Sequence, residues 1–235
     1  MIRLDKFLAN NTSLSRSEVA KAINAGRVVV MGENKITKET KIDENTAEVF
    51  LDNNRVNYSK YIYIMLNKPE GVVSATNDLK QKTVLDLLPS ELQKFNLFPC
   101  GRLDKDTLGL VILTNDGMGA HNVLSPKKHV EKTYAYECAD PLTTENKEKI
   151  EQGIKLADGY VTKPCKINLI SPNKGEITLT EGKYHEIKRL FGAVGNKITY
   201  LERITFGFIK LDKNLKRGEF RFLTKDEEKL FNQWY

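Results

Sequence analysis

The sequence predicts an α+β protein in which a small N-terminal module precedes a larger domain with a mostly antiparallel sheet and flanking helices. The first thirty residues contain two short helical patterns and one β-branched run. A polar, turn-rich segment follows at 52–60. Beyond it, strand-like runs outnumber helical ones, and the two kinds do not alternate strictly as they would around a parallel sheet.

The N-terminal module is predicted from local signals. Apolar residues at helical spacing predict the first helix, and these are Leu4, Phe7 and Leu8. Ser15 and Glu18 have the spacing of a capping box, which predicts a second helix that ends at Gly26. A strand is predicted at 27–30, and the Gly-Glu-Asn sequence at 32–34 predicts that it turns back as a hairpin.

The polar segment at 52–60 is the best candidate for a linker. We therefore expect two domains, 1–58 and 59–235. In the second domain, strands are expected at 61–66, 108–114, 132–138, 160–170, 176–180 and 197–206. Helices are expected at 83–88, 118–124, 144–152, 184–194 and 226–231, the last of them behind a capping box formed by Thr224 and Glu227.

Charge is unevenly distributed along the chain. The formal net charge is +6, from 37 Lys and Arg residues against 31 Asp and Glu residues. The excess is concentrated at 1–30 and 181–221, which favours a polyanionic partner such as RNA. Within 1–30 the basic residues are Arg3, Lys6, Arg16, Lys21 and Arg27. They form either an ordinary solvated face or an RNA-binding surface.

Several classes of protein are disfavoured. No apolar run approaches the ~20 residues that span a bilayer, and early charges interrupt any signal peptide, so we expect a cytoplasmic protein without a membrane segment. The isolated cysteines Cys100, Cys138 and Cys165 are expected to be reduced thiols in or near the core. Glycine-rich phosphate loops, HExxH and CxxC motifs are missing, so we expect neither cofactor nor metal.

One segment, 100–117, has the features of a reactive site. A charged loop, Gly-Arg-Leu-Asp-Lys-Asp-Thr at 101–107, leads directly into an apolar strand. Such a loop holds charged groups rigidly at a sheet edge, which suits a catalytic residue. Alternatively, Asp104 or Asp106 binds local backbone amides in a turn.

The sequence GRLDKDTLGLVILTNDG resembles the active-site motif of pseudouridine synthases, in the branch that includes the small-subunit ribosomal RNA enzyme. Residues 1–60 resemble an S4 RNA-binding domain, although Met31 stands where that family commonly has Asn. The sequences YIYIMLNKPEGVVSATNDLKQKTVLDLL, EKTY and LTEGKYHEIKRLFGAVGNKITYLERITFG resemble three further family segments. The resemblance covers nearly the whole chain.

The resemblance implies that the protein cleaves the N1–C1′ bond of a uridine, turns the uracil over and rejoins it through C5. Asp104 matches the nucleophilic aspartate. A carboxylate is ionised at neutral pH without a neighbouring base, and it suits a reaction at an electron-poor ribose carbon. Three routes stay open: attack at C1′, abstraction of a ribose proton, or addition to C6 of the base.

The same resemblance assigns further residues. Tyr134 would stack on the uracil near C5, or is a core tyrosine. Lys188 matches the cation that pairs with the aspartate, where many relatives have Arg, and Arg189 beside it is the other candidate for that pairing. A stacked uridine must be flipped out of its RNA to react. Arg102 would fill the gap or hold a phosphate, or forms an internal salt bridge.

The implied partner is ribosomal RNA, in a small-subunit assembly intermediate, and the protein is expected to act as a monomer without a cofactor. A hypothesis from another class is a non-catalytic S4-containing RNA-binding or ribosome-assembly protein with a degenerate catalytic domain. The intact Gly-Arg-Leu-Asp sequence, Tyr134 and the segment around Lys188 favour the enzyme.

Overall fold

The chain folds into two compact units, Met1–Tyr61 and Ile62–Tyr235, in a computed structural model that describes residues 1–12, 14–56 and 61–233. The division lies close to the predicted boundary between 58 and 59, which itself falls outside the described residues. Each unit has its own hydrophobic core.

The first unit combines two helices with short strands. Its elements are β1 (Ile2–Arg3), α1 (Leu4–Asn11), α2 (Arg16–Asn24), β2 (Val28–Val30), β3 (Lys41–Ile42), β4 (Val49–Leu51) and β5 (Asn54–Val56). The capping box predicted for α2 is confirmed, because Ser15 accepts from the backbone of Glu18 and the Glu18 side chain accepts from that of Ser15. Leu4, Phe7 and Leu8 are fully buried, as the helical spacing predicts.

Two predictions for this unit are wrong. β2 does not form a hairpin through a turn at 32–34. The next strand along the chain, β3, pairs with β1, and the partner of β2 is β4. The predicted linker at 52–60 begins inside a hairpin of β4 and β5. Asp52 and Asn53 both have positive φ there, a conformation that Asn and Asp tolerate better than most residues. Residues 57–60 lie outside the described residues.

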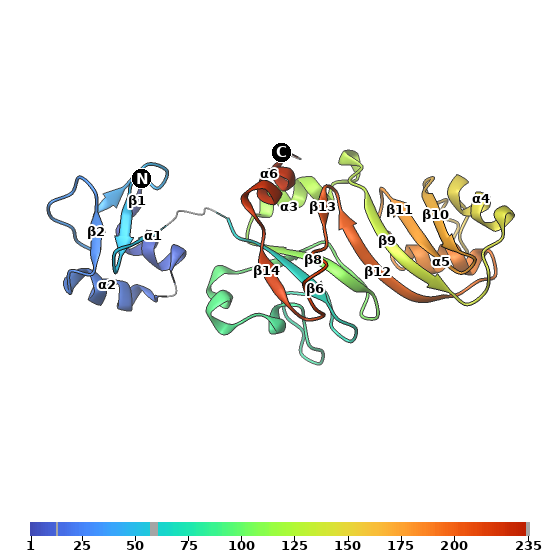
Figure 1. The fold of residues 1–235 in the computed structure, drawn as a ribbon, viewed down its shortest axis with the longest axis horizontal. Coiled ribbons are helices and arrows are strands. Elements are labelled where there is room, and N and C mark those ends of the chain that lie inside the picture. The colour runs from blue at the N-terminus through green and yellow to red at the C-terminus, as the bar shows by residue number, and fades with distance from the viewer. Residues whose placement is uncertain (13, 57–60, 234–235) are drawn as a thin grey trace. The chain divides into compact units, whose positions relative to one another are not determined.

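The second unit is built around one large sheet (Figure 1). Its strands are β6 (Tyr63–Lys68), β7 (Phe98–Cys100), β8 (Leu108–Thr114), β9 (Lys132–Cys138), β10 (Lys166–Ser171), β11 (Lys174–Leu179), β12 (Ile198–Phe206), β13 (Ile209–Lys210) and β14 (Phe220–Phe222). Its α-helices are α3 (Gly117–Leu124), α4 (Thr144–Gln152), α5 (Glu186–Ala193) and α6 (Lys225–Asn232). Short 3-10 turns lie at Leu85–Leu87, Ser90–Phe95 and Pro126–Lys128.

The strand order is β10-β11-β9-β12-β8-β6-β14, and the only parallel pair along this path of described strands is β12 with β8. The predicted mostly antiparallel sheet is therefore confirmed. At the parallel pair Gly109 has φ +98°, and a Cβ built there would lie 2.3 Å from the carbonyl oxygen of Arg203. Glycine thus permits the close approach that joins the two halves of the sheet.

Two further elements are shorter than predicted. The strand expected at 160–170 begins only at Lys166, as β10. Gly159 forms a turn before it, and Pro164 has no N–H to donate to a strand ladder. The helix expected at 83–88 is a single 3-10 turn, and Pro89 follows it.

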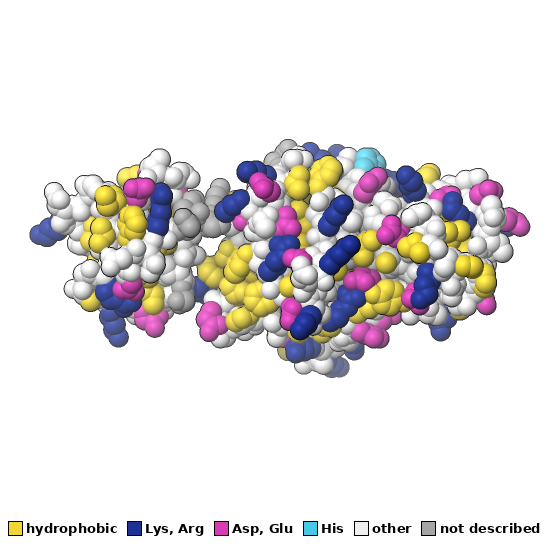
Figure 2. Space-filling view, in the orientation of Figure 1, with side chains coloured by type: hydrophobic (Ala, Val, Ile, Leu, Met, Phe, Trp, Pro, Cys, Tyr) yellow, Lys and Arg dark blue, Asp and Glu magenta, His cyan; other side chains and the backbone are white. Residues whose placement is uncertain are grey.

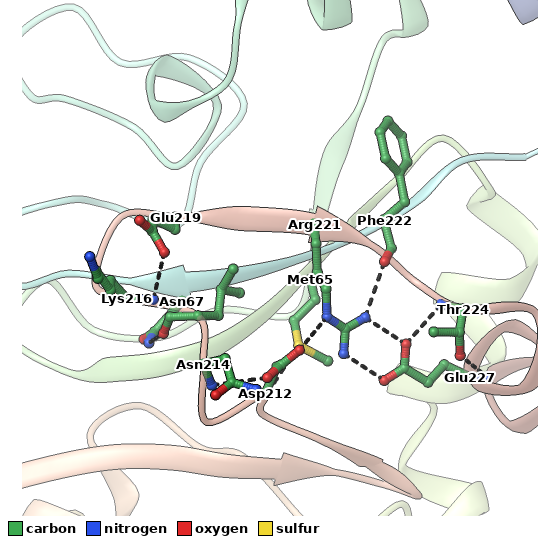
Figure 3. A network of polar contacts seen from close by, with 11 residues as sticks. Met65, Asn67, Asp212, Asn214, Lys216, Glu219, Arg221, Phe222, Thr224 and Glu227 are labelled. Carbon is green, nitrogen blue, oxygen red and sulfur yellow. Dashed lines mark hydrogen bonds and ion pairs between the residues drawn. The ribbon is translucent and has the colours of Figure 1, made fainter.

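The C-terminal segment is tied back onto the sheet by Arg221 (Figure 3). This β14 side chain donates to Asp212 and to Glu227, both at 2.7 Å. Glu227 also accepts from the backbone of Thr224, while its own backbone donates to the Thr224 hydroxyl, so the predicted capping box of α6 is confirmed. These contacts attach α6 to the edge of the sheet.

The surface is mixed in charge. In Figure 2, Lys and Arg side chains of the larger unit are interspersed with Asp and Glu. Cys100 and Cys138 are buried and Cys165 is half-buried, all three as free thiols, as predicted. Among the described residues no helix is long and apolar enough to cross a membrane.

Candidate active site

Two polar side chains bind the backbone of the charged loop between β7 and β8. Ser74 donates its hydroxyl hydrogen to the carbonyl oxygen of Leu103 at 3.1 Å and accepts from the Leu103 N–H at 3.0 Å. Lys68, at the end of β6, donates to the carbonyls of Lys105 and Thr107 at 3.1 and 2.8 Å. The backbone on both sides of Asp104 is therefore fixed by the protein.

Lys68 was not predicted as a site residue. It is fully buried, and burial lowers its pKa to about 8, although the carboxylates of Asp106 and Asp104 partly oppose this. A lysine at the end of an otherwise apolar strand, followed by Pro-Glu-Gly, is the signal that could have identified it. Its partners lie in a loop some forty residues away, so the sequence alone could not show them.

Asp104, in the loop before β8, lies beside helix α5. Lys188 Nζ lies 3.2 Å from Asp104 Oδ2 and 2.5 Å from Asp106 Oδ1. Burial opposes the charged form of Lys188, but the two carboxylates outweigh it and its pKa is raised. His185 Nε2 lies 3.6 Å from the other oxygen, Asp104 Oδ1. Lys188, rather than Arg189, is thus the cation beside Asp104.

Helix α5 begins two residues later than predicted. His185 has a left-handed backbone (φ 49°), so the helix starts at Glu186. The imidazole ring of His185 stacks on the ring of Tyr184, with 3.8 Å between the two ring centroids. Ile187, Leu190 and Phe191 are buried, as the apolar spacing predicts. Packing of this apolar face leaves Lys188 and His185 directed to Asp104.

Tyr134 lies on β9, is only 7% exposed and lines the same pocket as Asp104 and Lys188. This pocket holds about 70 Å³. Beside it, a second cleft of about 570 Å³, also lined by Tyr134 and Arg102, has the size of ligand sites in general. The pocket and the cleft together form an open site in which a carboxylate and an aromatic ring are neighbours.

The two arginines near the site differ in their surroundings. Arg102 is exposed and lines both the pocket and the cleft. Arg189 forms an ion pair with Asp158 and donates to the carbonyl of Tyr184 at 3.3 Å. Arg189 therefore points to a neighbouring loop and is not brought to Asp104.

The five basic residues predicted to contact RNA, all of them within 1–30 of the first unit, are exposed: Arg3, Lys6, Arg16, Lys21 and Arg27. Arg3 donates two hydrogen bonds to Asp5, and Arg27 donates two to Asp52. These two arginines thus have acidic partners within their own unit.

Two carboxyl groups meet near the start of α5, where Glu186 lines the pocket and Glu181 lines the cleft. Glu186 is 4% exposed and accepts from the backbone N–H of Lys183, and Glu181 accepts from the hydroxyl of Tyr160. Burial, and next the carboxylate of Glu181, raises the pKa of Glu186. Among the described residues no group of His, Cys, Asp and Glu side chains is arranged to hold a metal ion.

Glu186→Gln is expected to stabilise the protein increasingly as the pH rises. The native pKa of Glu186 is above its ordinary value of 4.5, so the folded state binds more protons than the unfolded state above that pH, and wild-type stability falls. The neutral amide removes this dependence. The check is the difference in Tm between variant and wild type from pH 5 to 8.5; a constant difference would contradict it.

Comparison with known proteins shows which family the chain resembles. A sequence profile described as RNA pseudouridylate synthase matches residues 62–193. This chain is 44% identical to an uncharacterized RNA pseudouridine synthase of Bacillus subtilis, covering 99% of both chains. It is 38% identical to the ribosomal small subunit pseudouridine synthase A of Escherichia coli, covering 96% of this chain and 98% of the relative.

The chain belongs to the RNA pseudouridylate synthase family. A crystal structure of a pseudouridylate synthase superposes on it with a TM-score of 0.70 and 37% identity, covering 98% of this chain and 100% of the other. The matched region of the RNA pseudouridylate synthase profile contains Asp104, Tyr134 and Lys188, the three residues that the structure brings into one pocket.

Proposed function

We propose that this protein isomerises one uridine of small-subunit ribosomal RNA to pseudouridine, with Asp104 as the reacting carboxylate. The observation that carries the proposal is the pocket in which Asp104, Lys188 and Tyr134 converge. Curated relatives matching nearly the full chain are named for the ribosomal small subunit. The proposed setting is the cytoplasm, with a monomeric protein acting on an assembly intermediate.

Each side chain has a role in this scheme. Lys188 holds the Asp104 carboxylate in place through a charge-assisted hydrogen bond and leaves its other oxygen available to the nucleotide. The Tyr134 ring offers a stacking surface for uracil beside that carboxylate. The reaction exchanges the N1–C1′ bond for a C5–C1′ bond, and the proton on C5 moves to N1 by way of solvent or a base.

The uridine must leave its stack to enter the pocket, at a cost of a few kcal/mol. Arg102 is exposed and lines both the pocket and the cleft. We infer that its guanidinium fills the gap in the RNA or binds an adjacent phosphate. Arg189 is placed further away, against Asp158, where it would contact backbone phosphates only.

The first unit is proposed to be an S4-like RNA-binding domain. Its exposed cations, Lys6, Arg16 and Lys21 together with Arg3 and Arg27, are suited to RNA phosphates. Its separate core supports independent folding of both units.

Deletion of residues 1–58 is expected to leave a folded catalytic unit that binds RNA more weakly. Each lost phosphate contact lowers the slope of log K against log salt by roughly 0.7 to 0.9. The measurement is RNA affinity from 50 to 300 mM salt, with thermal unfolding as the folding control. An unchanged slope would mean that the N-terminal cations face only solvent.

Tyr134→Phe is expected to keep stacking and much of the RNA affinity, whereas Tyr134→Leu should lose roughly fivefold to 150-fold in rate. Stacking of a base on an aromatic side chain contributes roughly 1–3 kcal/mol, and leucine removes it. Single-turnover pseudouridine formation by the two variants is the check. Equal rates for Leu and wild type would make Tyr134 a structural core residue.

The proposed function is tested with purified protein and small-subunit ribosomal RNA that lacks modifications. Carbodiimide treatment followed by primer extension marks each pseudouridine as a stop. One new stop with wild type and none with Asp104→Asn is expected. If RNA is bound but no stop forms under any condition, the protein is a non-catalytic RNA-binding factor.

A further inference from the structure

The cleft beside Tyr134 contains a buried cation that the chemistry above does not use. Arg203 lies on β12, paired with Tyr134 of β9, and is 1% exposed. Its Nε donates to the carbonyl of Leu110 at 2.8 Å. Its buried Nη2 has no hydrogen-bond partner among the described residues. An unpaired buried guanidinium is unfavourable unless it serves an anion.

A second cation lies next to it. Lys132 Nζ is 5.7 Å from the centre of the Phe206 ring, and the Arg203 guanidinium carbon is 5.0 Å from the same centre. Lys132 donates to the carbonyl of Val130 at 2.8 Å. Burial, followed by the charge of Arg203, lowers the pKa of Lys132 to about 8. The carboxylate of Glu186 opposes this lowering only in part, so the two close cations still favour a bound anion.

The cleft lined by Lys132 and Arg203 opens towards the reacting group. It shares Tyr134 and Arg102 with the pocket that contains Asp104. One carboxylate, Glu181, also lines the cleft, but it already accepts from the Tyr160 hydroxyl at 2.5 Å and from the Lys163 N–H at 2.7 Å. Against this one carboxylate the cleft is lined by five cations, so its net charge is positive: Arg102, Lys132, Lys163, Lys183 and Arg203.

We propose that Arg203 and Lys132 bind one phosphodiester group of the RNA, adjacent to the uridine whose base lies against Tyr134. The inference rests on the proposed function, because it takes an RNA strand as the substrate. A fixed phosphate sets the position of the flipped nucleotide relative to Asp104 without contacting the reacting atoms. Both cations are positioning residues.

The test combines neutral phosphate substitutions with protein variants. RNA affinity is measured for the small-subunit fragment that the protein binds most tightly, and for versions carrying one methylphosphonate at each position in turn. Wild type should lose about tenfold at one position next to the target uridine, because a hydrogen bond to a charged group contributes that much. Lys132→Met and Arg203→Met should lose about tenfold on natural RNA and nothing further from that methylphosphonate.

Matched controls keep the result interpretable. Lys210→Met removes an exposed cation that lines a separate cleft, so it should keep the full sensitivity to the methylphosphonate. Lys132→Arg keeps the charge and should keep the coupling. Arg203 is buried in the sheet, so thermal unfolding of its variant is compared with wild type, while Lys132→Met tests the site independently.

The phosphate site is overturned if every methylphosphonate weakens RNA binding by Lys132→Met and by Arg203→Met as much as it weakens binding by wild type. This holds even where pseudouridine forms normally. In that case Arg203 serves only to pack against Phe206. Coupling at one position in an RNA that never acquires pseudouridine would instead support the phosphate site and refute the proposed isomerisation.

Discussion

Asp104→Asn is expected to lower pseudouridine formation to less than about a thousandth of the wild-type rate, as removal of a reacting group does in other enzymes. The amide is nearly isosteric but supplies neither the negative charge nor the nucleophile. The loop should stay in place, because its backbone is held by hydrogen bonds to Lys68 and Ser74, and these bonds do not involve the Asp104 side chain.

The measurement is the single-turnover rate at saturating protein, with RNA affinity and Tm as controls. Asp106→Asn is the matched variant: it removes the other carboxylate that contacts Lys188, and it should retain most of the rate. Turnover by Asp104→Asn above a thousandth of wild type would exclude Asp104 as the reacting group.

Lys188→Met is expected to lower the same rate by about tenfold to a hundredfold. The variant removes the cation 3.2 Å from Asp104, and a charge-assisted hydrogen bond contributes roughly 1.5–3 kcal/mol. The partial exposure of both side chains, 25% for Lys188 and 28% for Asp104, places the effect towards the lower end.

Lys188→Arg restores the charge and should recover much of the rate. Arg189→Lys is the control on the same helix, because Arg189 pairs with Asp158 instead, and its rate should be close to wild type. A large loss in Arg189→Lys with an unaffected Lys188→Met would reverse the roles of the two cations.

Local features of the fold were predictable from the sequence, and pairings between distant segments were not. The capping boxes at Ser15 and Thr224 depend on side chains three residues apart, and both are present. The partner of β2 depends on β1 and β3, which are two residues each and carry no strand signal. Likewise, nothing local indicates that β14 completes the edge of the sheet beside β6.

In the candidate site, too, local placement was predictable and contacts between distant residues were not. Helical spacing places His185 and Lys188 on one face, but only the folded chain shows that they meet Asp104, which is 84 residues from Lys188. The sequence left open whether Asp104 or Asp106 binds backbone amides in a turn, and the structure shows that Asp106 pairs with Lys188. Arg203 interrupts an apolar strand pattern, and its burial comes from the parallel pairing at Gly109, which no local pattern encodes.

The central claim, that the pocket of Asp104 isomerises a uridine of small-subunit ribosomal RNA, is tested most directly in cells that lack this protein. Pseudouridines in their ribosomal RNA are mapped by carbodiimide and primer extension, with wild-type or Asp104→Asn protein restored at equal levels. We expect one pseudouridine to be missing from small-subunit RNA, and to be regained with wild type but not with Asp104→Asn. Recovery of that pseudouridine by Asp104→Asn, or an unchanged map in the deletion strain, would contradict it.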